Sequence, residues 1–93
     1  MAKRIIAFPT PTFDEPLTVA LLGESIRAKR TQSQLRIEDA AAMCGVSKQT
    51  FMNLERGKGT TQLSLVFQVC AALGIQLKIA PWLSEQEATD EWQ

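Results

Sequence analysis

The 93-residue sequence predicts a mainly α-helical fold, a compact domain of four to five helices followed by a short C-terminal strand. Three observations support this prediction. Apolar residues recur at helical spacing between residues 17 and 74. Glycines follow these stretches where the helices are expected to end. The run IQLKI then alternates strictly between apolar and polar residues, as a strand does.

Residues 1–16 are predicted to form an N-terminal arm. KRIIAF, at residues 3–8, is a candidate short strand. PTPTFDEP, at residues 9–16, holds three prolines in eight residues and predicts a stiff, extended connector. The arm could pair with another strand, lie on a partner or be disordered, and the sequence leaves these three roles open.

The first helix is predicted to begin after Thr18, which can act as its N-cap, and to run to about Arg30. Leu22 and Ile26 lie one turn apart on its inner side. Residues 31–34 are polar and are expected to form a break before the next helix.

The second helix is predicted from about Ile37 to Cys44. Its apolar residues recur at i, i+3, i+4 and i+7, the spacing of one buried stripe. Glu38 and Asp39 occupy its first turn, where the helix dipole favours acidic side chains. Gly45 supplies the left-handed residue that ends the helix.

The third helix follows after almost no loop. Ser47 is its predicted N-cap, and Val46 and Phe51 stand at the spacing of a hydrophobic staple. Gly57 closes the helix. A fourth helix, over Leu63–Leu73, is apolar almost all round, so it should be buried on more than one side.

Residues 75–83 are predicted to contain a dimerisation strand. A lone strand cannot satisfy its backbone groups, so IQLKI needs either KRIIAF or the same strand of a second copy. The second choice makes the protein a homodimer. Residues 84–93 form an acidic tail that is expected to be flexible. The predicted dimerisation residues are the apolar positions of the strand: Ile75, Leu77 and Ile79.

Composition excludes several classes of protein. The longest apolar run is far shorter than the about 20 residues of a membrane span, which favours a cytoplasmic location and no membrane partner. Cys44 and Cys70 fall on apolar helical faces and should act as small hydrophobes. A disulfide or metal site is the weaker interpretation, because histidine and a CxxC pair are absent. ERGKGT lacks the upstream glycine of a phosphate loop, so no enzyme and no cofactor is predicted.

Charge is distributed unevenly along a chain of zero net charge. Residues 1–58 carry nine basic and six acidic side chains, whereas residues 59–93 carry one basic and four acidic ones. A chain polarised in this way could hold its basic part against a polyanion. A solvated surface with chance asymmetry explains the same distribution.

The second and third helices, separated by Gly-Val-Ser at residues 45–47, form a helix-turn-helix. The exposed half of the third helix carries Lys48, Gln49 and Asn53. Lysine can donate to guanine, and glutamine or asparagine can bind adenine through two hydrogen bonds. Thr50 suits a phosphate oxygen. The set therefore fits the major groove of DNA; the alternative is a polar helix exterior that is only solvated.

The run AKRTQSQLRIEDAAAMCGVSKQTFMNLERGKG, residues 28–59, resembles the Cro/cI-type (XRE) helix-turn-helix family. The resemblance spans about residues 17–74 and implies both the fold and DNA binding. The shared pattern is an Arg that ends the first helix, an Ala four residues before the turn Gly, then Gly-Val-Ser and a closing Leu-Glu-x-Gly. These positions are Arg30, Ala41, Gly45, Val46, Ser47, Leu54, Glu55 and Gly57.

The resemblance also implies roles for single residues. Arg30 and Glu55 fall where the family has a buried, structural ion pair. The family often opens its second helix with Thr-Gln or Asn-Gln, whereas this chain has Arg36-Ile37, so Arg36 replaces the usual contact as a phosphate donor. The base-reading positions fall on Lys48, Gln49 and Asn53, and the phosphate positions on Thr50, Lys58 and Thr60. The complete predicted DNA-binding set is Arg36, Ser47, Lys48, Gln49, Thr50, Asn53, Lys58 and Thr60.

Within the family, the order of parts looks most like HipB-type antitoxins: a compact helical domain, one C-terminal strand that pairs across a two-fold axis, and a tail that ends near a Trp. This resemblance implies repression of the protein's own operon through an inverted-repeat operator at the nucleoid. It also implies binding of a HipA-like serine/threonine kinase toxin. Trp92 is then the partner-binding residue, unless it folds back onto its own domain.

Two other functions remain open. One is a stand-alone repressor of phage or housekeeping type that has no toxin partner. The other is a protein-interaction module whose helix-turn-helix no longer binds DNA, which Ile37 and the zero net charge favour.

Overall fold

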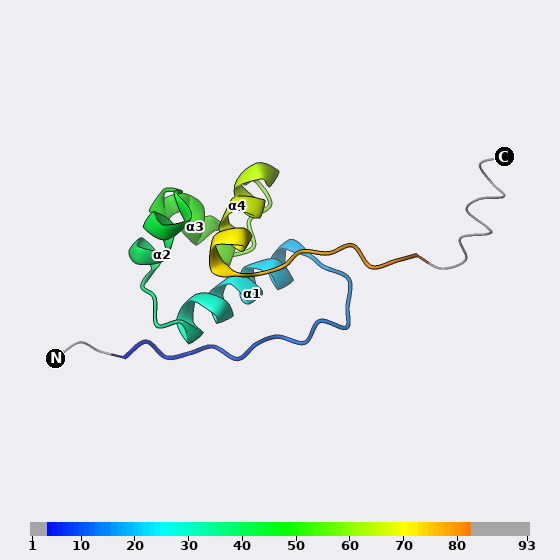
Figure 1. Ribbon diagram of the computed structural model, residues 1–93, viewed down its shortest axis with the longest axis horizontal. Helices are drawn as coiled ribbons and strands as arrows, with labels where there is room; N and C mark the ends of the chain where they lie inside the picture. Colours follow the sequence, from blue (N-terminus) through cyan, green and yellow to red (C-terminus); the bar gives the residue numbers. More distant parts are fainter. Residues whose placement is uncertain (1–3, 83–93) are drawn as a thin grey trace.

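Four α-helices make up the domain in the computed structural model, which describes residues 4–82. They are α1 (Val19–Gln32), α2 (Ile37–Cys44), α3 (Lys48–Glu55) and α4 (Leu63–Leu73) (Figure 1). The mainly α-helical prediction is therefore confirmed. Within residues 4–82, no helix is long and apolar enough to cross a membrane.

The helices begin and end where local sequence signals place them. The Thr18 hydroxyl oxygen accepts a hydrogen bond from the N–H of Leu21 at 3.0 Å and caps α1. Ser47 is the N-cap of α3, and α2 and α4 end at Gly45 and Gly74. Because these signals act over one turn of chain, the sequence alone is enough to locate them.

One apolar face of each helix forms the core. Helix α1 packs against α3 and α4, and α2 packs against the same two helices. Ile26 of α1, Phe51 of α3 and Val69 of α4 have no exposed surface. Around them lie the other buried apolar residues of the cluster: Ala40, Ala41, Cys44, Leu54, Val66, Cys70 and Leu73.

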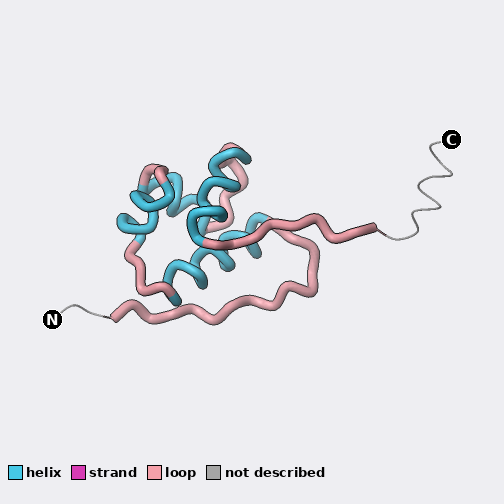
Figure 2. Tube along the Cα trace, viewed as in Figure 1, coloured by secondary structure: helices cyan, strands magenta, loops and turns pink. Residues whose placement is uncertain are grey.

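Both predicted strands are absent from the described single chain, residues 4–82 (Figure 2). Among residues 4–8, the backbone groups of Ile5 and Phe8 bond to the side chains of Thr31, Gln32 and Gln34 rather than to a second strand, so the predicted strand does not form within the described single chain. In the segment 75–82, the N–H of Ile75 donates to the carbonyl of Cys70 at 2.8 Å, and residues 76–82 form no backbone–backbone hydrogen bond within the described chain. A strand exists only as part of a ladder. Pairing of residues 75–79 with a second copy therefore stays a prediction.

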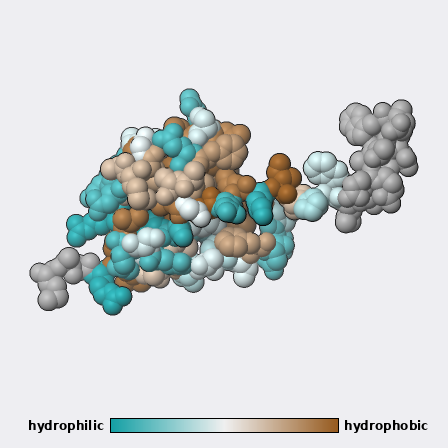
Figure 3. All heavy atoms as spheres, viewed as in Figure 1, coloured by the Kyte–Doolittle hydropathy of each residue, from teal (hydrophilic) through white to brown (hydrophobic). Residues whose placement is uncertain are grey.

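Helix α4 differs from its prediction as well. Val66 and Val69 face the core, but Leu63 is 65% exposed and Phe67 is 52% exposed. The prediction that α4 is buried on more than one side is wrong for the single chain. Hydrophobic residues, brown in Figure 3, gather on the visible face around α4.

Two predicted features lie outside the described residues. They are the acidic tail, residues 84–93, and the partner-binding residue within it, Trp92.

Candidate nucleic-acid interface

The turn between α2 and α3 is fixed from three directions. Gly45 ends α2 in the left-handed conformation, with φ of 75°. The N–H of Val46 folds back and donates to the carbonyl of Ala41 at 3.0 Å. From α4, the Gln68 amide donates to the carbonyl of Cys44 at 2.8 Å and to that of Gly45 at 3.3 Å. The end of α2 is therefore held in place by the neighbouring helix as well as by its own cap.

Ser47 organises the first turn of α3. Its hydroxyl oxygen accepts a hydrogen bond from the N–H of Thr50 at 3.0 Å, and its hydroxyl donates to Thr50 Oγ1 at 2.9 Å. Val46 is half-buried against the core and Phe51 is fully buried, which fits the predicted hydrophobic staple. These contacts orient α3 so that Gln49 and Asn53 lie on the opposite side from Phe51.

The two predicted base-reading amides, Gln49 and Asn53, lie side by side on the outer face of α3. Gln49 Nε2 donates to Asn53 Oδ1 at 3.0 Å. This bond uses one donor of Gln49 and one lone pair of Asn53, so a carbonyl oxygen and further N–H groups remain for a ligand. A donor and an acceptor held together are what the adenine edge requires. Lys48, exposed beside them, adds a cation that could donate to guanine.

The predicted phosphate contacts come from three segments. Arg36 is the N-cap residue of α2, and its side chain makes no capping hydrogen bond and is exposed. Thr50 lies in α3, while Lys58 and Thr60 lie in the loop that follows. The N–H of Lys58 donates to the carbonyl of Asn53 at 3.0 Å, which ties this loop to the end of α3. All eight predicted residues reach the surface; Arg36, Ser47, Lys48, Gln49, Lys58 and Thr60 are exposed, and Thr50 and Asn53 are half-buried.

Arg30 and Glu55 form the buried ion pair that the family resemblance implied. Arg30 Nη2 donates to Glu55 Oε1 at 3.1 Å, and Arg30 Nε donates to the other carboxylate oxygen. The side chains are only 8% and 7% exposed. Arg30 Nη1 also donates to the carbonyl of Leu35 at 2.8 Å. The pair ties the end of α1 to the end of α3 from inside, so it positions α3 and leaves almost no side-chain surface for a ligand.

Sequence reasoning missed two polar residues that fix the site. Gln68 locks the turn from α4, and Gln34, placed in a polar break, holds the N-terminal arm. Their partners lie 23 to 29 residues away in the sequence. No local periodicity marks such a contact, because the hydrogen-bonding groups meet only after the helices have packed.

The cysteines contribute no reactive group to this surface. Cys44 and Cys70 are both free and buried. Burial raises the pKa of both thiols, and Cys44 raises that of Cys70 further, which disfavours the nucleophilic thiolate. Their prediction as small hydrophobes is confirmed. Among residues 4–82, no group of three or more His, Cys, Asp or Glu side chains could hold a metal ion.

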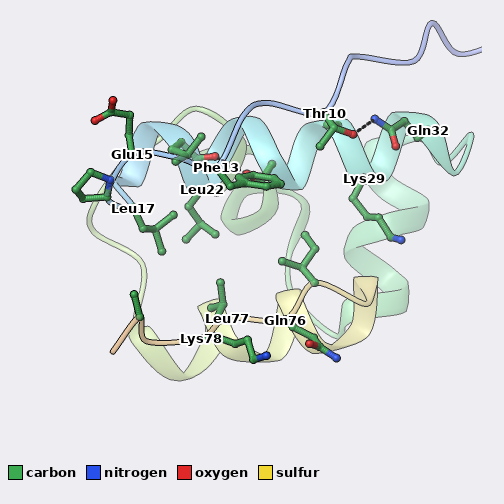
Figure 4. A pocket seen from close by; sticks show the side chains of 16 residues that line it. Thr10, Phe13, Glu15, Leu17, Leu22, Lys29, Gln32, Gln76, Leu77 and Lys78 are labelled. Carbon is green, nitrogen blue, oxygen red and sulfur yellow. Dashed lines mark hydrogen bonds between the residues drawn. The ribbon is translucent and has the colours of Figure 1, made fainter. Parts of the chain in front are cut away.

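A separate groove of about 690 Å³ lies between the N-terminal arm, α1 and the segment 75–80 (Figure 4). Phe13, Leu22 and Leu77 point into it from these three segments. It contains two of the predicted dimerisation residues, Ile75 and Leu77, but none of the eight predicted DNA-binding residues. The groove and the polar face of α3 are therefore distinct surfaces.

Comparisons with known proteins agree with this geometry. The family model described as Helix-turn-helix matches residues 26–79. The uncharacterized HTH-type transcriptional regulator y4mF of Sinorhizobium fredii (strain NBRC 101917 / NGR234) is 36% identical over 62 residues, which are 67% of this chain and 82% of that protein. The structure is also similar to a chain in the solved HipA-HipB-O2-O3 complex, with a TM-score of 0.65 and 19% identity. That match covers 74% of this chain and 97% of the solved chain, and at this identity it concerns the fold.

Proposed function

Since the chain belongs to the helix-turn-helix family of transcriptional regulators, we propose that it is a sequence-specific DNA-binding repressor that acts at the nucleoid. The observation that carries this proposal is the Gln49–Asn53 pair on the outer face of α3. Its neighbours, Thr50 and Phe51, are fixed by the Ser47 cap and by the core. A rigid helix that presents two amides and a lysine can enter the major groove with little loss of conformational freedom.

Phosphate contacts set the register of this helix on the duplex. Lys58 and Thr60 follow α3 directly, and Arg36 begins α2. In this proposal they bind the DNA backbone on either side of the groove that α3 enters. Such contacts add affinity for every DNA sequence, whereas Lys48, Gln49 and Asn53 select the sequence.

The proposed operator is an inverted repeat read by a homodimer. Residues 76–80 follow an elongated path (Figure 2) and make no backbone–backbone hydrogen bond within the described chain, so their N–H and C=O groups can pair with a second copy. Ile75, Leu77 and Ile79 would lie at this seam. Two copies of α3 would then reach half-sites about 34 Å apart or a multiple of that distance.

We further propose that the repressor is the antitoxin of a HipA-like serine/threonine kinase toxin. The similarity of fold to a chain of the HipA-HipB-O2-O3 complex supports this role, and so does the order of helical domain, alternating segment and acidic tail. The proposed partner anchor is Trp92, because an indole can fill an apolar pocket of the kinase while its N–H donates a hydrogen bond there.

The DNA-reading part is tested by selecting binding duplexes from a random pool with the wild-type protein and with single variants. Gln49→Ala and Asn53→Ala should each cost about 1–3 kcal/mol and relax preference at one base position. Lys58→Ala should weaken binding to all sequences alike. Gln76→Ala removes an exposed amide outside the helix-turn-helix and should leave the selected sequence unchanged. Identical preferences in wild type, Gln49→Ala and Asn53→Ala would refute base reading by these residues.

The antitoxin role is tested by deleting residues 84–93 and measuring both ligands. DNA affinity should persist, while binding to a HipA-like kinase encoded beside the gene should be lost. If the full chain binds DNA but no such kinase, the protein is a stand-alone repressor.

An interaction module that does not bind DNA is the second candidate, and the exposed Leu63 and Phe67 of α4 favour it. This candidate predicts that no duplex is retained at any salt concentration. A steep fall of DNA affinity with salt excludes it.

A further inference from the structure

The N-terminal arm is held to the domain by side chains at the end of α1. At its start, one amide binds both backbone groups of one residue: the N–H of Ile5 donates to Gln34 Oε1 at 3.0 Å, and Gln34 Nε2 donates to the carbonyl of Ile5 at 2.7 Å. A neighbouring strand would satisfy the same two groups. Gln34 therefore fixes the position of Ile5 on the surface.

A second set of contacts fixes the arm three residues further on. The N–H of Phe8 donates to Thr31 Oγ1 at 2.9 Å, and Gln32 Nε2 donates to the carbonyl of Phe8 at 2.8 Å. Gln32 also reaches Thr10 at 2.9 Å (Figure 4). The Arg27 guanidinium lies 4.0 Å from the centre of the Phe8 ring, a cation–π contact. With two anchored residues, the arm has one register along α1.

This register places the start of the arm beside the predicted DNA surface. Gln34 lies two residues before Arg36, the N-cap residue of α2. Arg4 lies next to Ile5, so its Cα is about 3.8 Å from that of the clasped residue. Arg4 and Arg36 are both exposed. Figure 1 shows the start of the arm at the end of the molecule that carries α2 and α3, while the segment 75–82 leads towards the opposite end.

The negative charge at the start of α2 favours an additional arginine at this edge of the molecule. Glu38 and Asp39 occupy the first turn of α2 and would repel a phosphate, and Arg36 offsets only one of these two charges. The guanidinium of Arg4, at the same edge, offsets the second acidic charge. Guanidinium groups also bind phosphate oxygens through two parallel hydrogen bonds, which an isolated positive charge cannot do.

We propose that Arg4 is a further DNA-contacting residue, which the Gln34 clasp holds near Arg36 so that both arginines bind phosphates of the DNA backbone. Gln34 is a positioning residue in this scheme, since it acts only through the arm. Holding the arm in advance lowers the entropy that Arg4 loses when it binds. The inference rests on the proposed DNA-binding function and adds a contact that lies outside the helix-turn-helix.

The test is the salt dependence of binding to a duplex that the wild-type protein has selected. For each protomer bound, Arg4→Ala should weaken binding about tenfold and should make the slope of log affinity against log salt less steep by about 0.9, the value for one phosphate. Gln34→Gly should produce the same two changes. Glycine is the suitable replacement, because Gln34 has a φ of 59°, a left-handed conformation that glycine adopts without strain. The double variant should be no weaker than either single one.

Lys29→Ala is the matched control, since it removes one positive charge from α1 at a position that lines the groove with Gln76. Its salt slope should equal that of the wild type. Wild-type slope and affinity in Arg4→Ala would overturn the inference while leaving the proposed function intact. If Arg4→Ala weakens DNA binding and Gln34→Gly does not, the positioning role of Gln34 would be overturned. If the wild-type protein retains no duplex even in dilute buffer, the proposed function fails, and this inference falls with it.

Discussion

The inner and outer faces of the eight-residue helix α3 have different environments. On the inner face, Phe51 and Leu54 are buried and Glu55 is paired with Arg30. On the outer face, the side chains of Gln49 and Asn53 bond only to each other among the described residues. Stability is therefore concentrated on one side of the helix and recognition on the other, so changes on the two faces should have separable effects.

Removing the carboxylate of the inner face should have the largest effect. Glu55→Ala leaves the Arg30 guanidinium buried without its partner and should lower the free energy of unfolding by about 3–5 kcal/mol. Urea denaturation measures this loss. Glu24→Ala removes an exposed acidic group of α1 and should change stability by less than about 0.5 kcal/mol. Replacing Arg30 and Glu55 together by methionine should recover much of the loss, and equal losses in the single and double variants would contradict a paired role.

Disturbing the contact between α1 and the end of α3 should have the second-largest effect on stability. A Cβ on Gly23 would lie 2.6 Å from the carbonyl oxygens of Leu54 and Glu55, so Gly23→Ala must push the two helices apart. It should cost about 1–3 kcal/mol of unfolding free energy although alanine is the better helix former. Gly59→Ala is the control, because its Cβ would meet only Val19 Cγ1 at 3.7 Å. A stable Gly23→Ala protein would show that this close approach is not required.

The cap of α3 should have a smaller effect. Ser47→Ala removes the oxygen that accepts from the N–H of Thr50 and should lower the unfolding free energy by about 1 kcal/mol. DNA affinity should fall with it, because the first turn of α3 carries Lys48 and Gln49. Thermal denaturation and duplex binding can be measured on the same sample. Ser64→Ala, at an exposed position in the first turn of α4, should match the wild type in both.

The outer face should contribute almost nothing to stability. Gln49→Ala breaks one exposed hydrogen bond and should change the unfolding free energy by less than about 0.5 kcal/mol. The same variant should still lose its preference at one base position. A large loss of stability in this variant would show that the two faces are not separate.

Much of the domain could be predicted because its signals are local. The caps at Thr18 and Ser47, and the glycine at position 45, act within one turn of chain, and the structure has them where the sequence placed them. The pair of Arg30 and Glu55 followed from the family resemblance instead, since nothing in the spacing of two residues 25 positions apart requires contact.

Predictions that depended on contacts between residues far apart in the sequence were less accurate. KRIIAF has the composition of a strand, yet Gln34 and Thr31 bind its backbone groups, and no pattern in the sequence announces that contact. Helix α4 is apolar on several sides, but the single chain covers only the side that carries Val66 and Val69. The sequence shows that Leu63 and Phe67 are apolar, but it does not show which surface they pack against.

The surface that meets DNA can be located most directly by recording backbone amide chemical shifts of the full chain while a selected duplex is added. The largest shifts should fall on residues 47–53 and 58–60, with the amides of Leu63 and Phe67 unchanged. Shifts confined to α4, or none in dilute buffer, would contradict recognition of DNA by the outer face of α3.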